Sequence, residues 1–377
     1  MQRRRLLMGS GAALALASTG ARAAEAGVTD KEVLLGHTGI LTGPLGATIK
    51  TLLSGADLAL AETNAQGGVA GRRLRLVSLD DELKPDKAVA NYQRLLGEQK
   101  VFGFFGCVGS ATTAAAAEVL AQSGAPLVGA YAVADSARDK VKGSAYFVRA
   151  TSGREAQALV QHLSTIGVTK IAVAHLDNPG GQEALALVQI ALASRQLKPH
   201  AAAAVKGDGS NAAEAARQLA AAQPQAVLMY LSGALPGELM KASFALGSHP
   251  MFYGMSIVAG DATSKVIGEQ ARGLAISQVV PYPWTDIDPV AREYRRLSEA
   301  AKVPVGYSSY EGYLSALVLI EAFKRCGREL TRARFHDTMR ALKQRMAGMD
   351  IDFTGGNHNG SRFVELVQVS VGGRYVR

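Results

Sequence analysis

The sequence predicts an α/β protein made of two doubly wound, Rossmann-like lobes joined by hinge strands. Short apolar stretches alternate with helical stretches through most of the chain, as in parallel sheets covered by helices on both faces. The alternation pauses after an extended stretch at 146–150 and then begins afresh. With 377 residues the chain is also long enough for two domains with separate cores.

The first unit is expected to run β-α-β-α-β-α-β. Its helices carry apolar residues at helical spacing, and Gly67-Gly68 ends the first of them as glycine does after a last turn. The expected elements of this unit are strands at 33–37, 73–79, 101–105 and 126–129 and helices at 51–65, 85–98 and 110–122.

The second unit repeats the alternation of strands and helices, and the C-terminal part of the chain then departs from it. Three consecutive helices are expected first, and then a hairpin across Gly372-Gly373. The expected strands are 170–175, 201–205, 226–231, 251–253, 273–280, 362–369 and 374–376. The expected helices are 154–166, 182–195, 211–223, 237–246, 261–267, 288–301, 309–326 and 331–342. A cleft between two such units is where a small ligand binds.

Residues 1–23 have the order of a cleaved export signal. Three arginines at 3–5 precede a weakly apolar stretch at 6–17, and Ala21-Arg22-Ala23 is a small-x-small cleavage site. A stretch of about 12 apolar residues falls short of the roughly 20 that cross a bilayer, which argues against a membrane anchor. The arginines followed by Leu6-Leu7 also resemble a twin-arginine signal, so both export routes stay open. We expect a periplasmic protein.

The composition argues against several classes of function. Without residues 1–23 the chain keeps 354 residues and its formal charge falls from +9 to +5, because four arginines are removed. The remaining excess is dispersed, so no nucleic-acid partner is expected. The seven histidines are scattered singly, and we expect neither a metal nor a cofactor. Cys107 and Cys326 could pair in an exported protein, but two buried free thiols are the favoured interpretation.

Candidate ligand contacts follow two strands of the first unit. Gly109, Ser110 and Thr112 join a strand to a helix at the strand's carboxyl end, where unpaired amides and the helix dipole favour an anion. Ser110 could also simply cap its helix, and the two roles are compatible. The next strand ends at Tyr131, Ala132 and Val133, whose backbone groups are expected to face the same cleft. Tyr131 is alternatively a half-buried packing residue.

No catalytic residue is assigned. The chain has no glycine-rich phosphate loop and no G-x-S-x-G nucleophile elbow. A Cys107 nucleophile would need a positioned histidine, and the sequence selects none. The acidic pairs Asp80-Asp81 and Asp350/Asp352 are expected to be solvated or capping residues.

Several motifs together resemble one family. They are Leu41–Leu45, Asn64–Gly71 followed by Asp80-Asp81, Val108–Ser110, Ala125–Gly129, Gln278–Pro281, Tyr310–Tyr313 and Phe363–Leu366. This combination resembles the leucine/isoleucine/valine-binding proteins, the periplasmic substrate-binding subunits of amino-acid ABC importers with the type I periplasmic-binding fold. The resemblance spans nearly the whole chain after the export signal.

The resemblance implies a monomer that captures a small organic solute between its lobes and delivers it to an ABC transporter permease in the inner membrane. The lobes are expected to close about strand hinges near 147–150, 277–280 and 353–356. Lobe 1 is expected over 28–148 and 278–354, and lobe 2 over 149–277 and 355–377. A ligand sensor of the same fold, or an exported hydrolase using Cys107 or Ser110, is the alternative.

The resemblance also implies a carboxylate site in lobe 1. In the family a serine at the position of Ser110 and a threonine hold the ligand's α-carboxylate, and the carbonyl at the position of Tyr131 takes the ammonium. The serine is kept here. The threonine position holds Val133, whose amide still donates while its side chain does not.

The ammonium side of the implied site is weaker. The family's acidic residue falls at Ser256, which brings no charge, and its aromatic positions fall at the smaller Gly180, Ala234 and Ser308. A buried ammonium without a carboxylate costs several kcal/mol. We therefore expect a larger or less cationic solute than an α-amino acid, such as a carboxylate or amide. Apolar contact is expected from three aromatic residues, Tyr131, Tyr282 and Trp284.

The family's disulfide is not expected. It joins a cysteine near the position of Leu83 to one beside the position of Ser110, and neither place holds a cysteine here. This agrees with the interpretation of Cys107 and Cys326 as free thiols.

Overall fold

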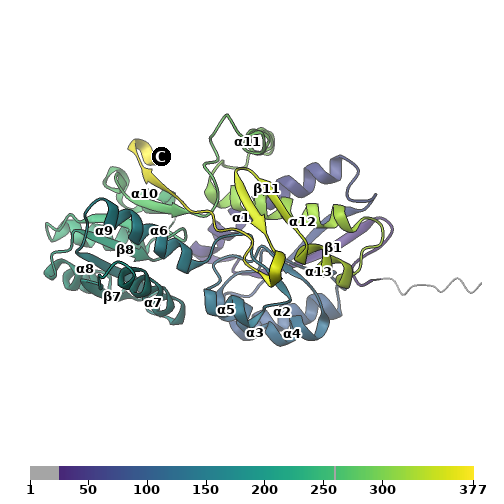
Figure 1. Ribbon diagram of the computed structural model, residues 1–377, viewed down its shortest axis with the longest axis horizontal. Helices are drawn as coiled ribbons and strands as arrows, with labels where there is room; N and C mark the ends of the chain where they lie inside the picture. The colour runs from purple at the N-terminus through teal and green to yellow at the C-terminus, as the bar shows by residue number, and fades with distance from the viewer. Residues whose placement is uncertain (1–24, 259) are drawn as a thin grey trace, which may run out of the picture.

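The computed structural model describes residues 25–258 and 260–377, so the expected export signal at 1–23 lies outside the described residues. Within them the chain forms two α/β lobes, which Figure 1 shows side by side. Each lobe is built on its own largely parallel sheet, so the predicted fold of two doubly wound lobes is confirmed. In this part of the chain no helix combines the length and apolarity that a membrane crossing requires.

The first lobe contains a parallel sheet with the strand order β2-β1-β3-β4-β5. β1 pairs with β2 along its whole length, with Leu35 opposite Leu76. The central strands are apolar and buried because helices cover both faces of the sheet. The strands are β1 (Glu32–Gly39), β2 (Arg73–Asp80), β3 (Gly103–Phe105), β4 (Leu127–Val128) and β5 (Ala145–Tyr146).

Helices cover this sheet from two sides. In Figure 1, α2, α3, α4 and α5 lie below it, and α1 and α12 lie above it. The helices of this lobe are α1 (Gly43–Ala65), α2 (Pro85–Gly97), α3 (Ser110–Ala115), α4 (Ala117–Ser123), α5 (Asp135–Lys140), α11 (Pro289–Ala301), α12 (Tyr307–Cys326) and α13 (Arg332–Arg340). An antiparallel hairpin of β11 (Lys343–Met346) and β12 (Met349–Asp352) follows α13.

The first lobe departs from the sequence prediction at several points. α1 begins at Gly43, eight residues before the expected start, with Pro44 in its first turn. The single helix expected at 110–122 is broken at Ala116, whose amide is shared between the carbonyls of Thr112 and Thr113. This sharing tightens the turn toward 3₁₀ geometry and separates α3 from α4. In addition, α5 and the β11–β12 hairpin are not predicted from the sequence, because such short elements show too little periodicity.

The second lobe contains a sheet with the strand order β14-β13-β10-β9-β8-β6-β7. Its parallel strands are β6 (Ile171–Leu176), β7 (Ala201–Val205), β8 (Ala226–Tyr230), β9 (Met251–Gly254) and β10 (Ala275–Gln278), and the antiparallel edge is β13 (Glu365–Val369) and β14 (Tyr375–Val376). Its helices are α6 (Ser152–Thr165), α7 (Pro179–Ala193), α8 (Ala212–Ala221), α9 (Leu235–Ala245) and α10 (Gly260–Ile267). Short 3₁₀ turns are η1 (Gly268–Ala271), η2 (Thr354–Gly356) and η3 (Val371–Gly373).

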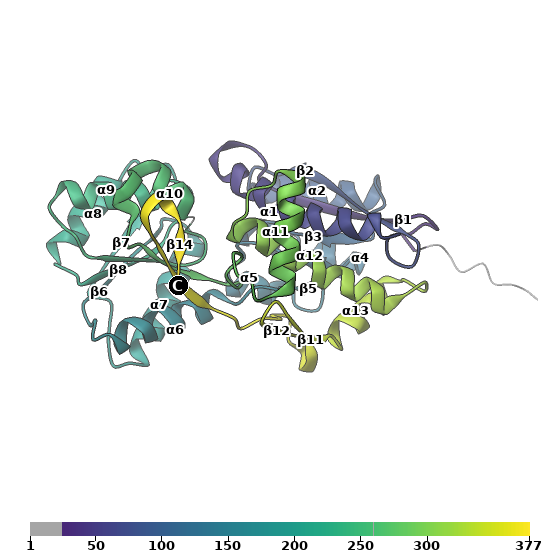
Figure 2. The ribbon, with the colours of Figure 1, turned by 90° about the horizontal axis from the view of Figure 1, so that it is seen from above.

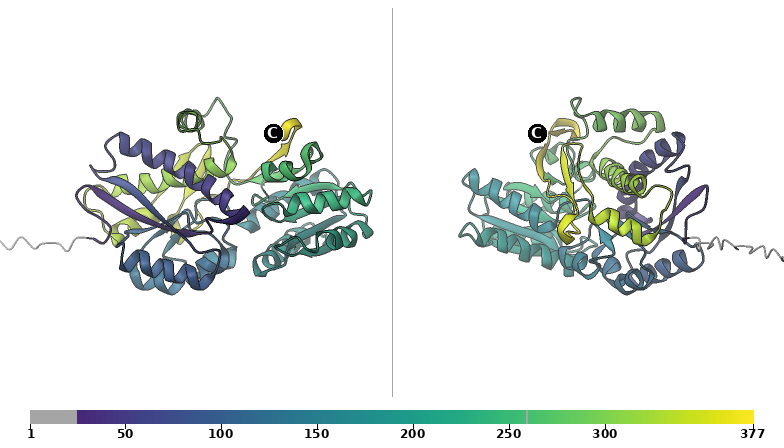
Figure 3. Two further views of the ribbon diagram at one scale, coloured as in Figure 1. Left: turned by 180° about the vertical axis from the view of Figure 1, so that it is seen from behind. Right: turned by 45° about the vertical axis from the view of Figure 1, so that its right-hand side comes forward.

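Within the described residues the chain passes between the lobes three times, after β5, after β10 and between β12 and β13. Figures 2 and 3 show the third passage in yellow, ending in the C-terminal hairpin beside α10. The buried Arg138 ties the first and third passages together. Its guanidinium donates to the carbonyls of Arg149 and Ala150 and to Oδ1 of Asn359. The lobe boundaries expected from the sequence stay predictions.

Two glycines set the position of α12 against α1. A Cβ atom added at Gly55 would lie 1.7 Å from the carbonyl oxygen of Ser309, and one at Gly312 would lie 1.9 Å from that of Leu52. Only glycine permits this approach of one helix backbone to the other. The close contact fixes the first turns of α12, which carry residues of the site described below.

We therefore predict that Gly312→Ala lowers the free energy of unfolding by about 3 kcal/mol or more, because both helix backbones must separate to admit the methyl group. The matched control is Gly97→Ala at the end of α2, where an added Cβ meets nothing within 4 Å. That change is expected to be neutral or to stabilise by up to about 1 kcal/mol. Urea denaturation measures both effects, and equal stabilities of the two variants would contradict the packing argument.

Candidate functional site

A cavity of about 610 Å³ lies between the two lobes. Small-molecule sites typically have volumes of about 300–1,000 Å³. Its walls come from the loop and first turns of α12 in the first lobe and from the turn after β9 in the second. The segment after β10 and the C-terminal hairpin complete them. Relative movement of the lobes would therefore change contacts on several sides of a bound solute.

Four aromatic residues, Tyr282, Trp284, Tyr307 and Tyr375, form one side of the cavity and are called the aromatic wall here. The ring of Trp284 lies edge-on to Tyr307 and stacks on Tyr375, at 5.7 Å between centroids in each case. Tyr282 lies 5.1 Å from Trp284 and donates a hydrogen bond of 3.1 Å to the Tyr375 carbonyl. These rings come from the passage after β10, from α12 and from the C-terminal hairpin, and they offer a solute an apolar surface.

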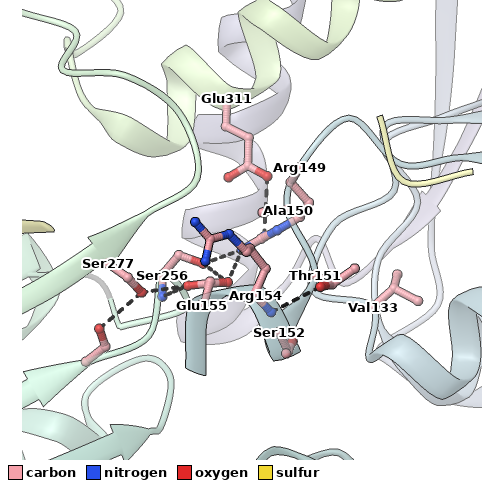
Figure 4. Close-up of polar contacts among 12 residues, drawn as sticks. Val133, Arg149, Ala150, Thr151, Ser152, Arg154, Glu155, Ser256, Ser277 and Glu311 are labelled. Atoms are coloured by element: carbon pink, nitrogen blue, oxygen red, sulfur yellow. Dashed lines mark hydrogen bonds and ion pairs between the residues drawn. The ribbon is translucent and has the colours of Figure 1, made fainter. Parts of the chain in front are cut away.

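A buried ion-pair network centred on Arg149 adjoins the cavity (Figure 4). The Nη1 atom of Arg149 lies 3.3 Å from Oε1 of Glu311, and Nη2 lies 3.5 Å from Oε1 of Glu155. Nη2 also donates to the hydroxyl of Ser256, and the guanidinium lies 5.0 Å from the ring centroid of Tyr131. Arg149 itself is only 5% exposed.

The network joins both lobes and the first passage between them. Arg149 follows β5, Glu311 lies on α12 of the first lobe, and Glu155 lies on α6 of the second. Burial alone would lower the pKa of Arg149, but the carboxylates of Glu311 and Glu155 raise it above its ordinary value. The guanidinium is therefore charged at every physiological pH and holds the two carboxylates near each other.

The two acids are satisfied to different degrees. The Glu155 carboxylate accepts hydrogen bonds from the Ser256 amide (2.7 Å), the Ser256 hydroxyl (2.9 Å) and the Ser277 hydroxyl (2.7 Å), besides its ion pair. Glu311 makes one ion pair within the described chain, to Arg149, and it lines the cavity. Burial raises the pKa of Glu311, although the Arg149 cation acts in the opposite direction. Glu311 is thus the acid that a solute can reach.

One family model matches nearly the whole chain. The model of the periplasmic binding protein family matches residues 32–374. The chain belongs to the periplasmic binding protein family. This confirms the resemblance found in the sequence, and membership implies a periplasmic location.

Individual relatives agree with this assignment. The Leu/Ile/Val-binding protein of Escherichia coli K12 is 25% identical over 260 residues, covering 67% of this chain and 69% of that protein. A substrate-binding periplasmic protein from Ralstonia solanacearum has a TM-score of 0.84 and 28% identity, covering 92% of this chain and 99% of that one. A branched-chain amino acid ABC transporter protein from Thermus thermophilus with bound valine has a TM-score of 0.81 at 16% identity, over 92% and 95% of the two chains, and shows the fold alone.

Three of the expected ligand contacts in this periplasmic binding protein lie around the start of α3. The Ser110 hydroxyl accepts from the Ala134 amide at 2.9 Å and donates to the Ala132 carbonyl at 3.4 Å. The Thr112 hydroxyl donates to the Gly109 carbonyl at 3.0 Å, one turn back in the chain. None of Gly109, Ser110 and Thr112 lines the cavity in the described chain. Their polar groups are engaged locally, and their role in binding stays a prediction.

The three expected contacts in the loop after β4 lie in different surroundings. The side chain of Tyr131 lines the cavity, while its amide donates to Cys107 and its carbonyl accepts from Gly109. Ala132 has a φ of +52°, and the carbonyl of Val133 accepts from Nε of Arg138 at 3.0 Å. This loop therefore contributes an aromatic ring to the cavity, whereas its carbonyls bond to other parts of the first lobe.

In the second lobe, Ser256 lies on the cavity wall but its hydroxyl is already bonded to Arg149 and Glu155. Of the small residues that the resemblance places at the family's aromatic positions, Ser308 lines the cavity and Gly180 does not. A Cβ atom added at Gly180 would lie 3.9 Å from the Ser110 hydroxyl. The start of α7 therefore lies close to α3 across the lobes.

The two cysteines lie away from the cavity wall. Cys107 and Cys326 are free and buried, which confirms the interpretation as free thiols. Burial raises the pKa of the Cys107 thiol to about 12, so it is a poor nucleophile near neutral pH. Among the described residues no three His, Cys, Asp or Glu side chains are placed to hold a metal ion.

The sequence does not predict the roles of Arg149, Glu155 and Glu311. Their partners are distant in sequence, and single charged residues are ordinarily solvated. One signal was available for Glu311. It occupies the first turns of α12, a helix whose other residues in that region are almost all small, aromatic or apolar, and a lone acid there indicates a buried role.

We predict that Glu311 makes the stability of the unliganded protein depend on pH. Because burial raises its pKa in the folded state above the unfolded value, the folded state holds a proton that the unfolded state has lost. The free energy of unfolding of the wild type minus that of Glu311→Gln should therefore increase as pH falls from 7.5 toward 4.5. The limiting slope for one proton is about 1.4 kcal/mol per pH unit.

Chemical denaturation at a series of pH values measures this difference. Glu321→Gln is the matched control, because Glu321 lies on the same helix and forms a half-exposed ion pair with Arg325. The pH dependence of the Glu311 difference should exceed that of the Glu321 difference. A Glu311 difference that decreases as pH falls would mean that Arg149 dominates burial and would contradict the assignment.

Proposed function

We propose that this chain captures a small organic solute between its lobes and delivers it to the permease of an ABC importer in the inner membrane. It would reach the periplasm through the export signal at 1–23 and act there as a monomer. Capture and delivery involve no covalent chemistry. The solute would be released when the lobes separate at the permease.

The observation that carries this proposal is the cavity of about 610 Å³ with walls from both lobes and from the passage after β10 that joins them. Contacts made only when the lobes are close supply the differential affinity that couples binding to closure. The aromatic wall spans the two lobes in this way, because Tyr307 belongs to α12 and Tyr375 to the C-terminal hairpin.

The relatives support the same role. The Escherichia coli protein is named for binding leucine, isoleucine and valine, and it matches two thirds of this chain. For this chain, Ser110 and Val133, which the resemblance implies for an α-carboxylate, do not line the cavity, whereas Tyr131, which it implies for the ammonium, does. We therefore propose a solute other than a branched-chain α-amino acid, with an apolar body that packs on the aromatic wall. An exported hydrolase is less well supported, because Cys107 is buried with a raised pKa and the Ser110 hydroxyl is bonded to the backbone of Ala132 and Ala134.

We predict that Trp284→Ala weakens solute binding about thirtyfold or more, as expected when a buried aromatic contact worth about 2 kcal/mol is removed. Ile287→Ala is the matched control. Ile287 lies in the same loop and is 90% exposed, so its removal should leave the affinity unchanged. A thermal-shift screen of amino acids, amides, aromatic acids and amines identifies ligands through the rise in apparent stability. Calorimetry then measures the affinities.

In the same screen, leucine and valine are expected to bind weakly or not at all. Tight binding of either amino acid would contradict the proposal that the solute binds away from the positions that hold an α-amino acid in the family. A screen in which no solute raises the melting temperature, together with steady turnover of any compound, would overturn the proposed function itself.

A further inference from the structure

Glu311 is the one acidic residue on the cavity wall within the described chain. Its side chain points from α12 toward Arg149, as Figure 4 shows. Oε1 lies near the guanidinium at 3.3 Å, which leaves the rest of the carboxylate's acceptor capacity for a group in the cavity. A donor that enters the cavity therefore meets a carboxylate without having to displace Arg149.

The charges around this carboxylate do not balance. Arg149 faces two acids, Glu155 and Glu311, so ionisation of both leaves one negative charge in excess. The neighbouring Arg138 does not remove that excess. Its guanidinium donates to four oxygen acceptors and also acts on Glu311, but counting it together with the nearby Asp135 leaves the same excess of one negative charge. One further cation would neutralise the buried group.

The aromatic wall fits the same kind of solute. Rings of Trp and Tyr attract cations through their negative faces and also bury apolar surface. Trp284, Tyr282, Tyr307 and Tyr131 all line the cavity together with Glu311. An aromatic or aliphatic body can therefore pack on the rings while its charged end meets the carboxylate.

Two arginines near the opening do not reverse this preference. Arg374 lines the cavity but is exposed at the C-terminal hairpin, so solvent screens its charge. Arg377 lies over the ring of Tyr282 at 4.7 Å, is half exposed, and pairs with Glu365 at 3.8 Å. The buried charged group on the cavity wall is the Glu311 carboxylate, which is negative.

We propose that the captured solute is a cation with an aromatic or apolar body, and that its positive group binds Glu311 while its body packs on the aromatic wall. The inference rests on the proposed function and narrows its substrate class. It also differs from the hypothesis drawn from the sequence, in which a carboxylate or amide was favoured because no acid was expected in the cleft.

Calorimetry on the whole protein without its export signal tests the inference with three probes at pH 7.5. They are 2-phenylethylamine, which is a cation at this pH, 3-phenylpropionate, which pairs a similar body with an anionic group, and L-leucine. We expect 2-phenylethylamine to bind at one site. The anion should bind at least about tenfold more weakly, because like charges placed together are strongly unfavourable.

The Glu311→Gln variant should lose about thirtyfold or more in affinity for 2-phenylethylamine, as when one member of a buried charge pair is removed. Glu311→Asp keeps the charge and should retain part of the affinity. Glu321→Gln on the same helix is the matched control and should bind like the wild type. A thermal melt without ligand verifies that each variant is folded.

A pH series on the wild type gives an independent test if Glu311→Gln does not fold. The cation favours ionised Glu311, so its affinity should fall as pH decreases from 7.5 toward 4.5. Three of the other groups that face Glu311 keep their charge state over this range. Arg149 and Arg138 stay cationic, and burial raises the pKa of Tyr131 to about 12. Glu155 is bonded by four donors.

The outcomes separate this inference from the proposed function. Tighter binding of 3-phenylpropionate or leucine than of 2-phenylethylamine would contradict the inference that the solute is a cation. It would leave the proposed capture of a solute unaffected. Equal affinity of the wild type and a folded Glu311→Gln would also overturn the inference. If the amine fails to bind while the broader screen yields an uncharged or anionic ligand, the inference falls alone.

Discussion

The structure depends on one buried cation, the guanidinium of Arg149. It lies where the chain first passes between the lobes, with an acid from each lobe beside it. Removing one partner from such a buried group ordinarily costs about 3–5 kcal/mol, because the remaining charge cannot be solvated. The positions of α6 and α12 are thus coupled through Glu155 and Glu311. The close approach of α12 to α1 at Gly312 transmits the same constraint into the core of the first lobe.

The Arg149 network also uses a residue that the sequence resemblance assigns to the ligand. Ser256, which the resemblance aligns with an acid of the family, holds Glu155 with its hydroxyl and amide. Across the cleft, a Cβ atom added at Gly180 would lie 3.9 Å from the Ser110 hydroxyl, so the start of α7 lies close to α3. The accessible volume lies instead against Trp284 and the C-terminal hairpin.

The sequence predicts the fold well because its signals are local. Strands such as 201–205 and helices such as α2 are visible in runs and periodicity of a few residues. The family resemblance, rather than any local pattern, led us to expect apolar contact from Tyr131, Tyr282 and Trp284, and all three line the cavity. The ion pairs could not be predicted in this way. Arg149 and Glu311 are far apart in the sequence and come into contact because the chain returns to the first lobe. No local sequence pattern predicts such a contact.

Glu155 and Glu311 differ in the number of their hydrogen-bond donors. This difference bears on how solute binding is coupled to closure of the lobes. Glu155 has three hydrogen-bond donors besides Arg149, so the guanidinium remains anchored to the second lobe whatever happens at Glu311. A cationic group that meets Glu311 need not break the pair that joins the lobes, and it removes the excess negative charge that burial makes costly. The occupied, closed arrangement would then be favoured over the empty one, because the same carboxylate that destabilises the empty cavity is neutralised by the solute.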